Sequence, residues 1–181
     1  MGINALNNNT TASSNTAVGY NAGNNVTTGT NLVILGATSA SSTATATNEI
    51  TLGNASIATL RCQVTTITAL SDERDKKDIR DIGLGLDFVA RLRPVKFKWA
   101  MRDGTEKPDE FEAGFIAQDF QRTQMEANAE WLGLVYESNP DKLEASPGKL
   151  IPVLVKALQE LSQRNESLEA RLAKLETGNT A

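Results

Sequence analysis

Few residue types in this chain could carry out catalysis. The 181 residues include no histidine and a single cysteine, Cys62. Ser-His-Asp triads, Cys-His dyads and histidine metal sites are therefore excluded, and one cysteine can form neither an intrachain disulfide nor a thiolate zinc cage. Catalysis would have to use carboxylates, lysines, hydroxyl groups or the Cys62 thiol. Arg61 is the only basic neighbour of Cys62, which argues against a reactive thiolate there.

The densest group of chemically capable residues runs from Ser71 to Ile79, in the order Ser-Asp-Glu-Arg-Asp-Lys-Lys-Asp-Ile. Taken alone, this segment is typical of a helix N-terminus. Ser71 would cap the helix, Asp72 and Glu73 would complement the helix dipole, and the lysines would be solvated.

The same segment marks an abrupt change in composition. Residues 1–70 contain one acid, Glu49, and one base, Arg61, whereas residues 71–181 contain 21 acids and 17 bases. Asparagine, threonine and serine make up 32 of the first 70 residues. We therefore divide the chain into two domains, 1–70 and 71–181.

The first domain contains short β-type stretches at 15–23, 31–36 and 48–55, separated by Gly and Asn turns. Aliphatic residues then recur every three or four positions from Ile57 to Leu70. So polar a segment buries too little apolar surface to offset its ordering entropy as a monomer. We expect it to borrow a core from neighbouring chains as a stacked or intertwined β-stalk, and the alternative is a low-complexity Asn/Thr linker.

The second domain is predicted to be small and mixed, so that the fold class is α+β. Leu86, Val89 and Leu92 have helical spacing, which Pro94 ends. The patterns predict strands over 95–99, 111–116 and 132–136, a helix over about 118–125 and a loop over 138–147.

A heptad repeat runs from Ile151 through four heptads, with apolar residues at seven of eight seam positions. The a positions are Ile151, Leu158, Asn165 and Leu172, and the d positions are Leu154, Leu161, Leu168 and Leu175. Arg164 and Arg171 at g match Glu169 and Glu176 at the following e, which favours a parallel, in-register coiled coil. We expect this helix over about 149–176, because Pro152 is tolerated only in its first turn.

Two points about this helix stay open. Asn165 at an a position leaves the number of chains undecided. The helix could also be amphipathic and pack on its own domain, although the long seam and the matched charges argue against it.

The charged segment resembles the start of the intramolecular chaperone auto-processing domain at the C-terminus of phage tailspikes and tail fibres, as in endosialidase tailspikes. The hallmark Ser-Asp-x-Arg-x-Lys, followed shortly by Ile, is matched by Ser71, Asp72, Arg74, Lys76 and Ile79. Three further blocks match in order, at 92–99, 113–118 and 150–161. The resemblance covers nearly all of residues 71–181.

The resemblance implies a chaperone that drives homotrimer assembly through stalk and coiled coil, and then cleaves itself off between Leu70 and Ser71. Ser71 would be the nucleophile and Lys76 the base, with Lys77 as the fallback base. Lysine acts as a base only when neutral, and burial on trimerisation would favour the neutral form. Ser71 could attack the Leu70 carbonyl directly or assist a water molecule.

The spacing of the two residues sets a condition on this chemistry. Residues five apart stand about 140° apart on a helix and point to opposite faces of a strand. Ser71 and Lys76 can therefore meet only if the backbone bends between them, or if Lys76 comes from another chain.

The resemblance also implies a location on the virion tail fibre, release of residues 71–181 into the host cytoplasm, and receptor binding by the fibre upstream. The net charge of −4 disfavours nucleic-acid binding, and the longest apolar run, 32–37, is too short for a membrane span. No cofactor or metal is expected. The main alternative is a non-cleaving trimerisation or adhesion module of a fibrous surface protein, and a membrane-tethered transcription factor is a weaker one.

Overall fold

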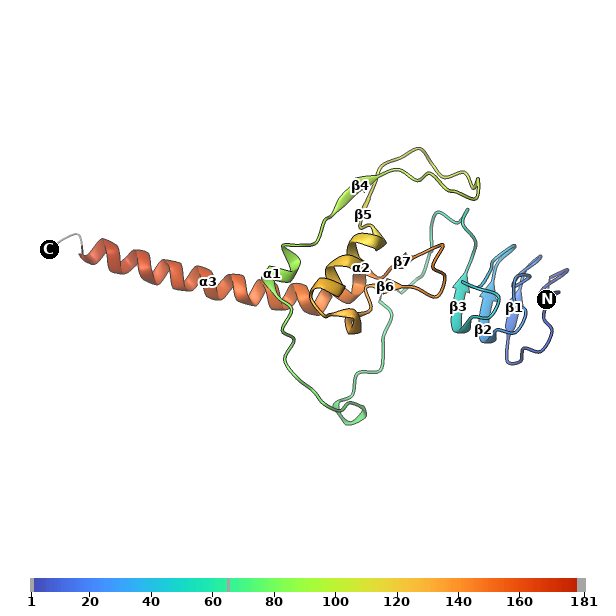
Figure 1. Cartoon of the computed structure of the whole chain (residues 1–181), viewed down its shortest axis with the longest axis horizontal. Coiled ribbons are helices and arrows are strands. Elements are labelled where there is room, and N and C mark those ends of the chain that lie inside the picture. Colours follow the sequence, from blue (N-terminus) through green and yellow to red (C-terminus); the bar gives the residue numbers. More distant parts are fainter. Residues whose placement is uncertain (1, 65, 179–181) are drawn as a thin grey trace. The chain divides into compact units, whose positions relative to one another are not determined.

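The computed structural model describes residues 2–64 and 66–178. The described chain is α+β, with small sheets and a long C-terminal helix, and this part of the predicted fold class is confirmed (Figure 1). The chain divides into two compact units. One contains residues 1–67, 97–112 and 137–142, and the other contains residues 68–96, 113–136 and 143–181.

The first unit is built on a parallel sheet of three strands, in the order β1 (Thr16–Val18), β2 (Thr30–Leu35) and β3 (Thr47–Leu52). Partner residues on neighbouring strands are 17 positions apart, as in the pairs Thr16–Val33 and Thr30–Thr47. One turn of the chain therefore takes 17 residues, and successive turns stack as a solenoid (Figure 1).

A repeat of backbone conformation produces this stacking. Left-handed φ angles recur every 17 residues, at Asn4, Asn21 and Thr38 and again at Ser14, Asn31 and Asn48. Glycines recur at the same interval, at Gly2, Gly19, Gly36 and Gly53. A Cβ atom on Gly19 would lie 2.5 Å from the carbonyl oxygen of Gly36, so no side chain fits there. This repeat was not predicted, because its 17-residue interval is far longer than the period of a helix or a strand.

The first unit has a hydrophobic core of its own. Its buried members are Ala17, Ala22, Val26, Leu32, Ile34 and Ala46. Asparagine side chains complete the backbone hydrogen bonding: Asn15 Nδ2 donates to Gly29 O at 2.7 Å, and Asn15 Oδ1 accepts from Leu32 N at 3.0 Å. The prediction that this domain must borrow its core is therefore wrong, because short side chains fill a narrow coil that one chain closes by itself.

Residues 57–64 and 66–72 follow the solenoid without a helix or strand. The aliphatic side chains spaced along them are all exposed, namely those of Ile57, Leu60, Val64, Ile67 and Leu70. Their spacing of three or four residues does not produce a helix, and their apolar surface stays in contact with solvent.

The core of the second unit lies among α1 (Leu86–Val89), α2 (Ala117–Glu126) and the start of α3 (Ile151–Gly178). Its buried members are Phe88, Phe120, Ala129, Leu132, Leu134, Val135, Leu150 and Val153. The helix predicted over about 118–125 is confirmed as α2, and the helix predicted before Pro94 is confirmed in shorter form as α1, which ends at Val89. The predicted strand over 132–136 is confirmed only at its end, since a 3-10 turn occupies Glu130–Leu132 and β6 is Val135–Tyr136. The predicted loop over 138–147 is wrong in part, because it contains β7 (Glu144–Ala145), which pairs with β6.

The predicted strands over 95–99 and 111–116 are confirmed in shorter form. They are β4 (Val95–Phe97) and β5 (Glu112–Gly114), which form a two-stranded sheet. Ahead of β4, Arg93 Nε donates to Asp119 of α2 at 2.8 Å, and Arg122 donates to the same carboxylate at 2.5 Å. The hydrogen bond from Arg93 is the main reason that the pKa of Asp119 lies below its ordinary value.

Helix α3 begins about two residues later than predicted, after a 3-10 turn over Pro147–Leu150. Pro152 is its second residue, where the missing amide hydrogen is harmless. One face of α3 packs on the second unit and buries Val153 and Ala157.

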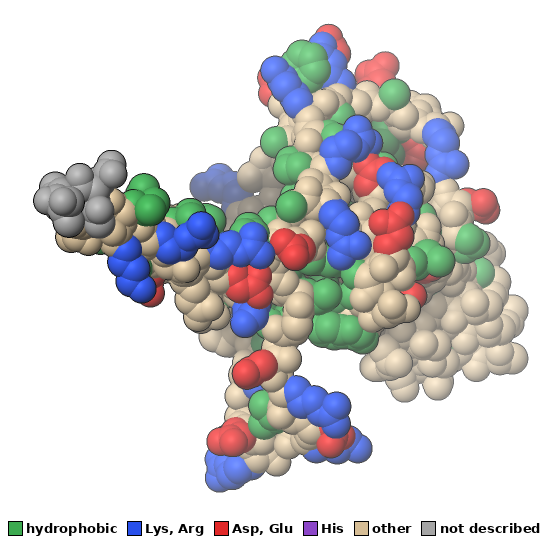
Figure 2. Space-filling model, turned by 60° about the vertical axis from the view of Figure 1, so that its left-hand side comes forward, with side chains coloured by type: hydrophobic (Ala, Val, Ile, Leu, Met, Phe, Trp, Pro, Cys, Tyr) green, Lys and Arg blue, Asp and Glu red, His purple; other side chains and the backbone are tan. Residues whose placement is uncertain are grey.

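The predicted coiled-coil seam of α3 is a different face. Its apolar members are exposed, and the exposed fraction is 63% for the first of them, Ile151, and 70% for the last, Leu175. Figure 2 shows apolar side chains on the surface of this helix, between charged ones. The helix α3 therefore packs on its own domain, as the alternative expected, but it does so through the stripe that contains Val153 and Ala157. The seam residues do not take part in this packing.

Candidate functional site

The charged segment forms one 3-10 turn, Glu73–Asp75, rather than the start of a longer helix. Asp72 is its N-cap, since Asp72 Oδ1 accepts a hydrogen bond from the backbone N–H of Arg74 at 2.9 Å. The prediction that Ser71 is the cap is wrong. The aspartate carboxylate takes that role, and the Ser71 side chain is left for another partner.

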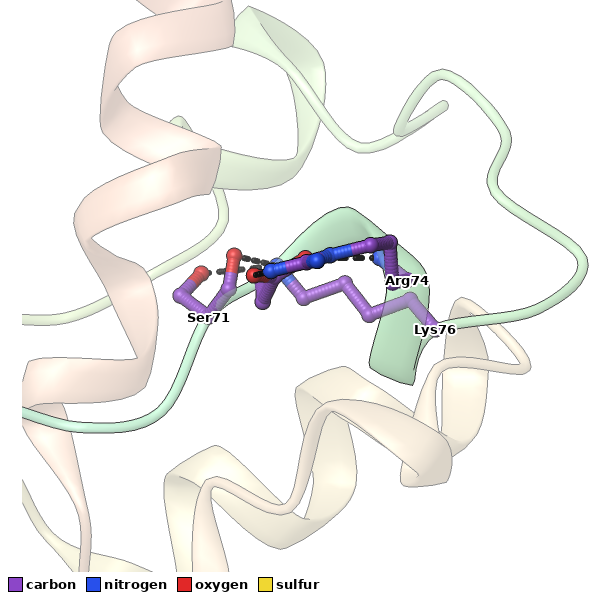
Figure 3. A network of polar contacts seen from close by, with 4 residues as sticks. Ser71, Arg74 and Lys76 are labelled. Atoms are coloured by element: carbon purple, nitrogen blue, oxygen red, sulfur yellow. Dashed lines mark hydrogen bonds and ion pairs between the residues drawn. The ribbon is translucent and has the colours of Figure 1, made fainter.

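That partner is Lys76. Lys76 Nζ donates to Ser71 Oγ at 2.7 Å and to the Ser71 carbonyl oxygen at 3.1 Å (Figure 3). The backbone turns through Glu73–Asp75 and becomes extended at Lys76, with φ −120° and ψ 150°. The side chain of Lys76 therefore folds back over the turn. The bend that five-residue spacing requires is thus present, and the contact forms within one chain.

The two side chains lie in solvent. Ser71 and Lys76 are both exposed, and the preceding Leu70 is 83% exposed. In this state the lysine donates in both of its contacts. An ammonium group can donate to the serine hydroxyl but cannot accept its proton. The arrangement places a base candidate at the nucleophile candidate without the dry surroundings that favour a neutral amine.

Arg74 completes the group of polar residues in Figure 3. Its Nε donates to Asp72 Oδ1 at 3.0 Å, and its Nη2 donates to Asp72 Oδ2 at 2.6 Å. This fork of two bonds is the geometry that pairs guanidinium with carboxylate most strongly. The side-chain bond from Arg74, and then its backbone bond, hold the pKa of Asp72 below its ordinary value. The pairing of Asp72 with Arg74 was not predicted from the sequence.

The other candidate residues give no second site. Lys77 is exposed, and in the described chain the hydrogen bonds to Ser71 come from the side chain of Lys76. Cys62 is a free, exposed thiol. Within residues 2–64 and 66–178, no group of three or more Cys, Asp or Glu side chains is placed to hold a metal ion. The described part of the chain also has no helix whose length and apolar character would let it cross a membrane.

Comparison with known families bears directly on this segment. Residues 71–128 match the model of a peptidase family described as the chaperone of endosialidase. The match starts at Ser71 and includes Lys76, and it confirms the resemblance to the endosialidase-type chaperone domain. No curated protein and no solved structure matches the chain.

Proposed function

We propose that residues 71–181 are the C-terminal chaperone of a phage tail fibre or tailspike, which drives homotrimer assembly and then cleaves the Leu70–Ser71 bond. The observation that carries this proposal is the 2.7 Å contact between Ser71 Oγ and Lys76 Nζ at the first residues of the family match. A hydroxyl beside an amine is the pair that a chain without histidine can use for nucleophilic cleavage.

The proposed reaction has two steps. Neutral Lys76 Nζ takes the proton of Ser71 Oγ, which attacks the Leu70 carbonyl carbon. The C–N bond breaks, the Ser71 nitrogen takes a proton from Lys76, and Leu70 becomes an ester of Ser71. Water then hydrolyses the ester, which leaves a carboxylate on Leu70 and restores the hydroxyl of Ser71. In the alternative route Ser71 assists a water molecule that attacks the same carbonyl.

Assembly supplies the trigger in this proposal. Ser71 and Lys76 are exposed in the single chain, so the amine keeps its solvation there. Packing of three chains around the segment would remove water from the amine and disfavour its charged form. Cleavage would then follow correct assembly rather than precede it.

The exposed surface of α3 supports association of chains. An apolar side chain stands at seven of the eight seam positions, and the part of α3 that packs on its own unit uses another stripe. Exposed leucines at a and d positions over four heptads are the surface that parallel helices bury against one another. We propose a trimer on the basis of the family resemblance, since Asn165 does not decide the number of chains.

The solenoid offers a second surface for the same association. Val18, Leu35 and Leu52 stand one above another at the 17-residue interval, and each is exposed. The aliphatic side chains between Ile57 and Leu70 add further unpartnered apolar surface. We propose that three self-closed solenoids lie side by side as the stalk, and that the extended segment after them is where the chains intertwine.

The same proposal gives location and partners. The stalk would stay on the virion, residues 71–181 would be released in the host cytoplasm, and the fibre ahead of the stalk would bind the host receptor. The proposed function involves no nucleic acid, membrane or cofactor.

Electrophoresis of the purified chain tests the proposal. We expect two fragments from the wild type, with the smaller one beginning at Ser71 by mass spectrometry. Ser71→Ala and Lys76→Ala should each give one uncut band while still forming trimers in sedimentation. Lys77→Ala, which changes the neighbouring lysine, is the matched control and should be cut.

The alternative function is a non-cleaving trimerisation module. The exposed seam of α3 supports it independently of the serine and lysine. A wild-type chain that forms trimers and stays whole would establish this alternative and exclude the protease.

A further inference from the structure

The Ser71–Lys76 contact depends on a turn that has little else to hold it. The 3-10 turn Glu73–Asp75 contains no buried residue and only three residues in all. Its backbone bonds are Asp75 N to Asp72 O at 3.2 Å and Lys76 N to Glu73 O at 3.0 Å. Such short turns are marginal in water without packing or capping. Side-chain bonds must therefore supply much of its order.

Apart from the two bonds from Lys76 to Ser71, the side-chain bonds at this turn come from one carboxylate. Asp72 Oδ1 caps the turn through the backbone N–H of Arg74 and also accepts from Arg74 Nε, while Asp72 Oδ2 accepts from Arg74 Nη2 (Figure 3). The amide and the guanidinium of Arg74 thus both bind the carboxylate that caps the start of the turn, while the end of the turn is closed by the backbone bond from Lys76 N to Glu73 O.

We propose that Asp72 and Arg74 are positioning residues for the Ser71–Lys76 pair, an inference that rests on the proposed cleavage. They act on the backbone bend and leave the reacting atoms to Ser71 and Lys76. A lysine fixed at hydrogen-bond distance reacts far faster than one on a loose loop, because the entropy of bringing the groups together is already lost.

The two residues of the pair carry opposite charges on the same segment as Lys76. An isolated carboxylate next to Lys76 would favour its ammonium form and oppose proton transfer from Ser71. Arg74 neutralises Asp72, so the brace fixes the bend without adding net charge. Glu73, Asp75 and Lys77 lie on the same exposed segment and stay unchanged in the variants below.

This charge balance gives the two single variants opposite pH behaviour. Arg74→Gln leaves the Asp72 carboxylate unpaired, so the pH midpoint of cleavage should rise. Asp72→Asn leaves the Arg74 guanidinium unpaired, so the midpoint should fall. Each shift should be about 0.5 pH unit, as for a partly screened charge pair. A residue that acted only on folding would move neither midpoint.

Single-turnover cleavage of the full chain, followed by electrophoresis over a range of pH, tests the inference. We expect Asp72→Asn and Arg74→Gln each to slow cleavage about tenfold or more. The double variant should be no slower than the slower single variant, because the two residues act as one unit. Arg74→Lys should also be slow, since it keeps the charge and loses the fork, but its pH midpoint should not move. Arg80→Gln, an exposed arginine of the same segment, is the matched control and should cut like the wild type.

Each result decides the question. If the wild type cuts and the variants cut at its rate with its pH midpoint, this inference is wrong and the proposed function stands. If the variants fail to assemble by sedimentation, the brace serves assembly and the inference is also wrong. A wild type that stays whole would remove the proposed function itself, and the inference with it.

Discussion

Thr38 occupies a backbone conformation that suits asparagine better than threonine. Its φ angle is +55°, and the equivalent residues of the two preceding solenoid turns are Asn21 and Asn4. β-Branched side chains are strained in the left-handed region, whereas asparagine is enriched there. Thr38 Oγ1 donates to Ala37 O at 2.7 Å and accepts from Asn54 Nδ2 at 3.0 Å, and these bonds offset part of the strain.

Replacing Thr38 by asparagine should therefore stabilise the protein. We expect Thr38→Asn to raise the free energy of unfolding by about 0.5–1 kcal/mol, because the left-handed conformation costs asparagine less. Thermal unfolding followed by circular dichroism, in the uncut Ser71→Ala background, measures the change. Asn21→Thr is the reverse substitution at the matched position and should lower stability. Equal unfolding temperatures for all three chains would contradict this account of the repeat.

At the scale of secondary structure, the carboxylate of Glu160 in α3 forms a hydrogen bond with the first residue of α1. Glu160 Oε2 accepts a hydrogen bond from Leu86 N, the first residue of α1, at 2.8 Å. Gly85 leaves room for it, since a Cβ atom there would lie 2.2 Å from the same oxygen. Arg164 adds a weaker contact, with its Nη2 atom 3.5 Å from Asp87 Oδ1, and the interchain pairing predicted for Arg164 stays a prediction. A negative group at an N-terminal amide is favourable, so Glu160 orients α1 on the helix that carries the seam.

Removing this carboxylate should loosen α1 from α3. We expect Glu160→Ala to lower the free energy of unfolding by about 1–2 kcal/mol, the usual size of a charged hydrogen bond with partial exposure. Urea unfolding gives the value. Gln163→Ala, an exposed change one turn along the same helix, should cost under about 0.5 kcal/mol. Equal losses in the two variants would show that Glu160 acts only through helix propensity.

At the scale of the whole molecule, the chain exposes more organised apolar surface than a monomer needs. The seam of α3, the Val18–Leu35–Leu52 ladder and the segment from Ile57 to Leu70 all face solvent. Each is periodic along the chain, and a second copy presents the same period. This is the physical basis for treating assembly as the first event and cleavage as its consequence.

The seam offers the sharpest test of that order. Leu161→Asp places a charge at a d position, where burial against partner helices would be costly, so trimers should be lost. Cleavage should disappear with them, because Lys76 would stay solvated. Sedimentation and electrophoresis of the same sample measure both. Gln163→Asp, a polar change outside the seam, should leave both unchanged, and Leu161→Asp monomers that still cut would refute the assembly trigger.

Local and periodic patterns in the sequence determined which chemistry is available, where the long helix lies and where the candidate site lies. The absence of histidine limited the chemistry to carboxylates, lysines, hydroxyl groups and one thiol. The heptad located the long helix, and the Ser-Asp-x-Arg-x-Lys pattern located the segment that matches the chaperone family. Such signals are readable because each depends on composition or on residues a few positions apart. The 17-residue repeat was not predicted, because its equivalent positions are far apart in sequence and mix glycine and asparagine turns with the apolar set Val18, Leu35 and Leu52.

The tertiary structure alone decided the rest. Which stripe of α3 packs inward depends on Phe88 and Phe120, which are distant in sequence from the helix. Whether the solenoid could enclose a core depended on how its alanine, valine, leucine and isoleucine side chains pack inside the coil. The meeting of Ser71 and Lys76 depended on a bend at Glu73–Asp75, beside which Asp72 accepts three hydrogen bonds from Arg74. In each case the outcome depends on a contact between groups, and the distance between those groups is set by the folded backbone.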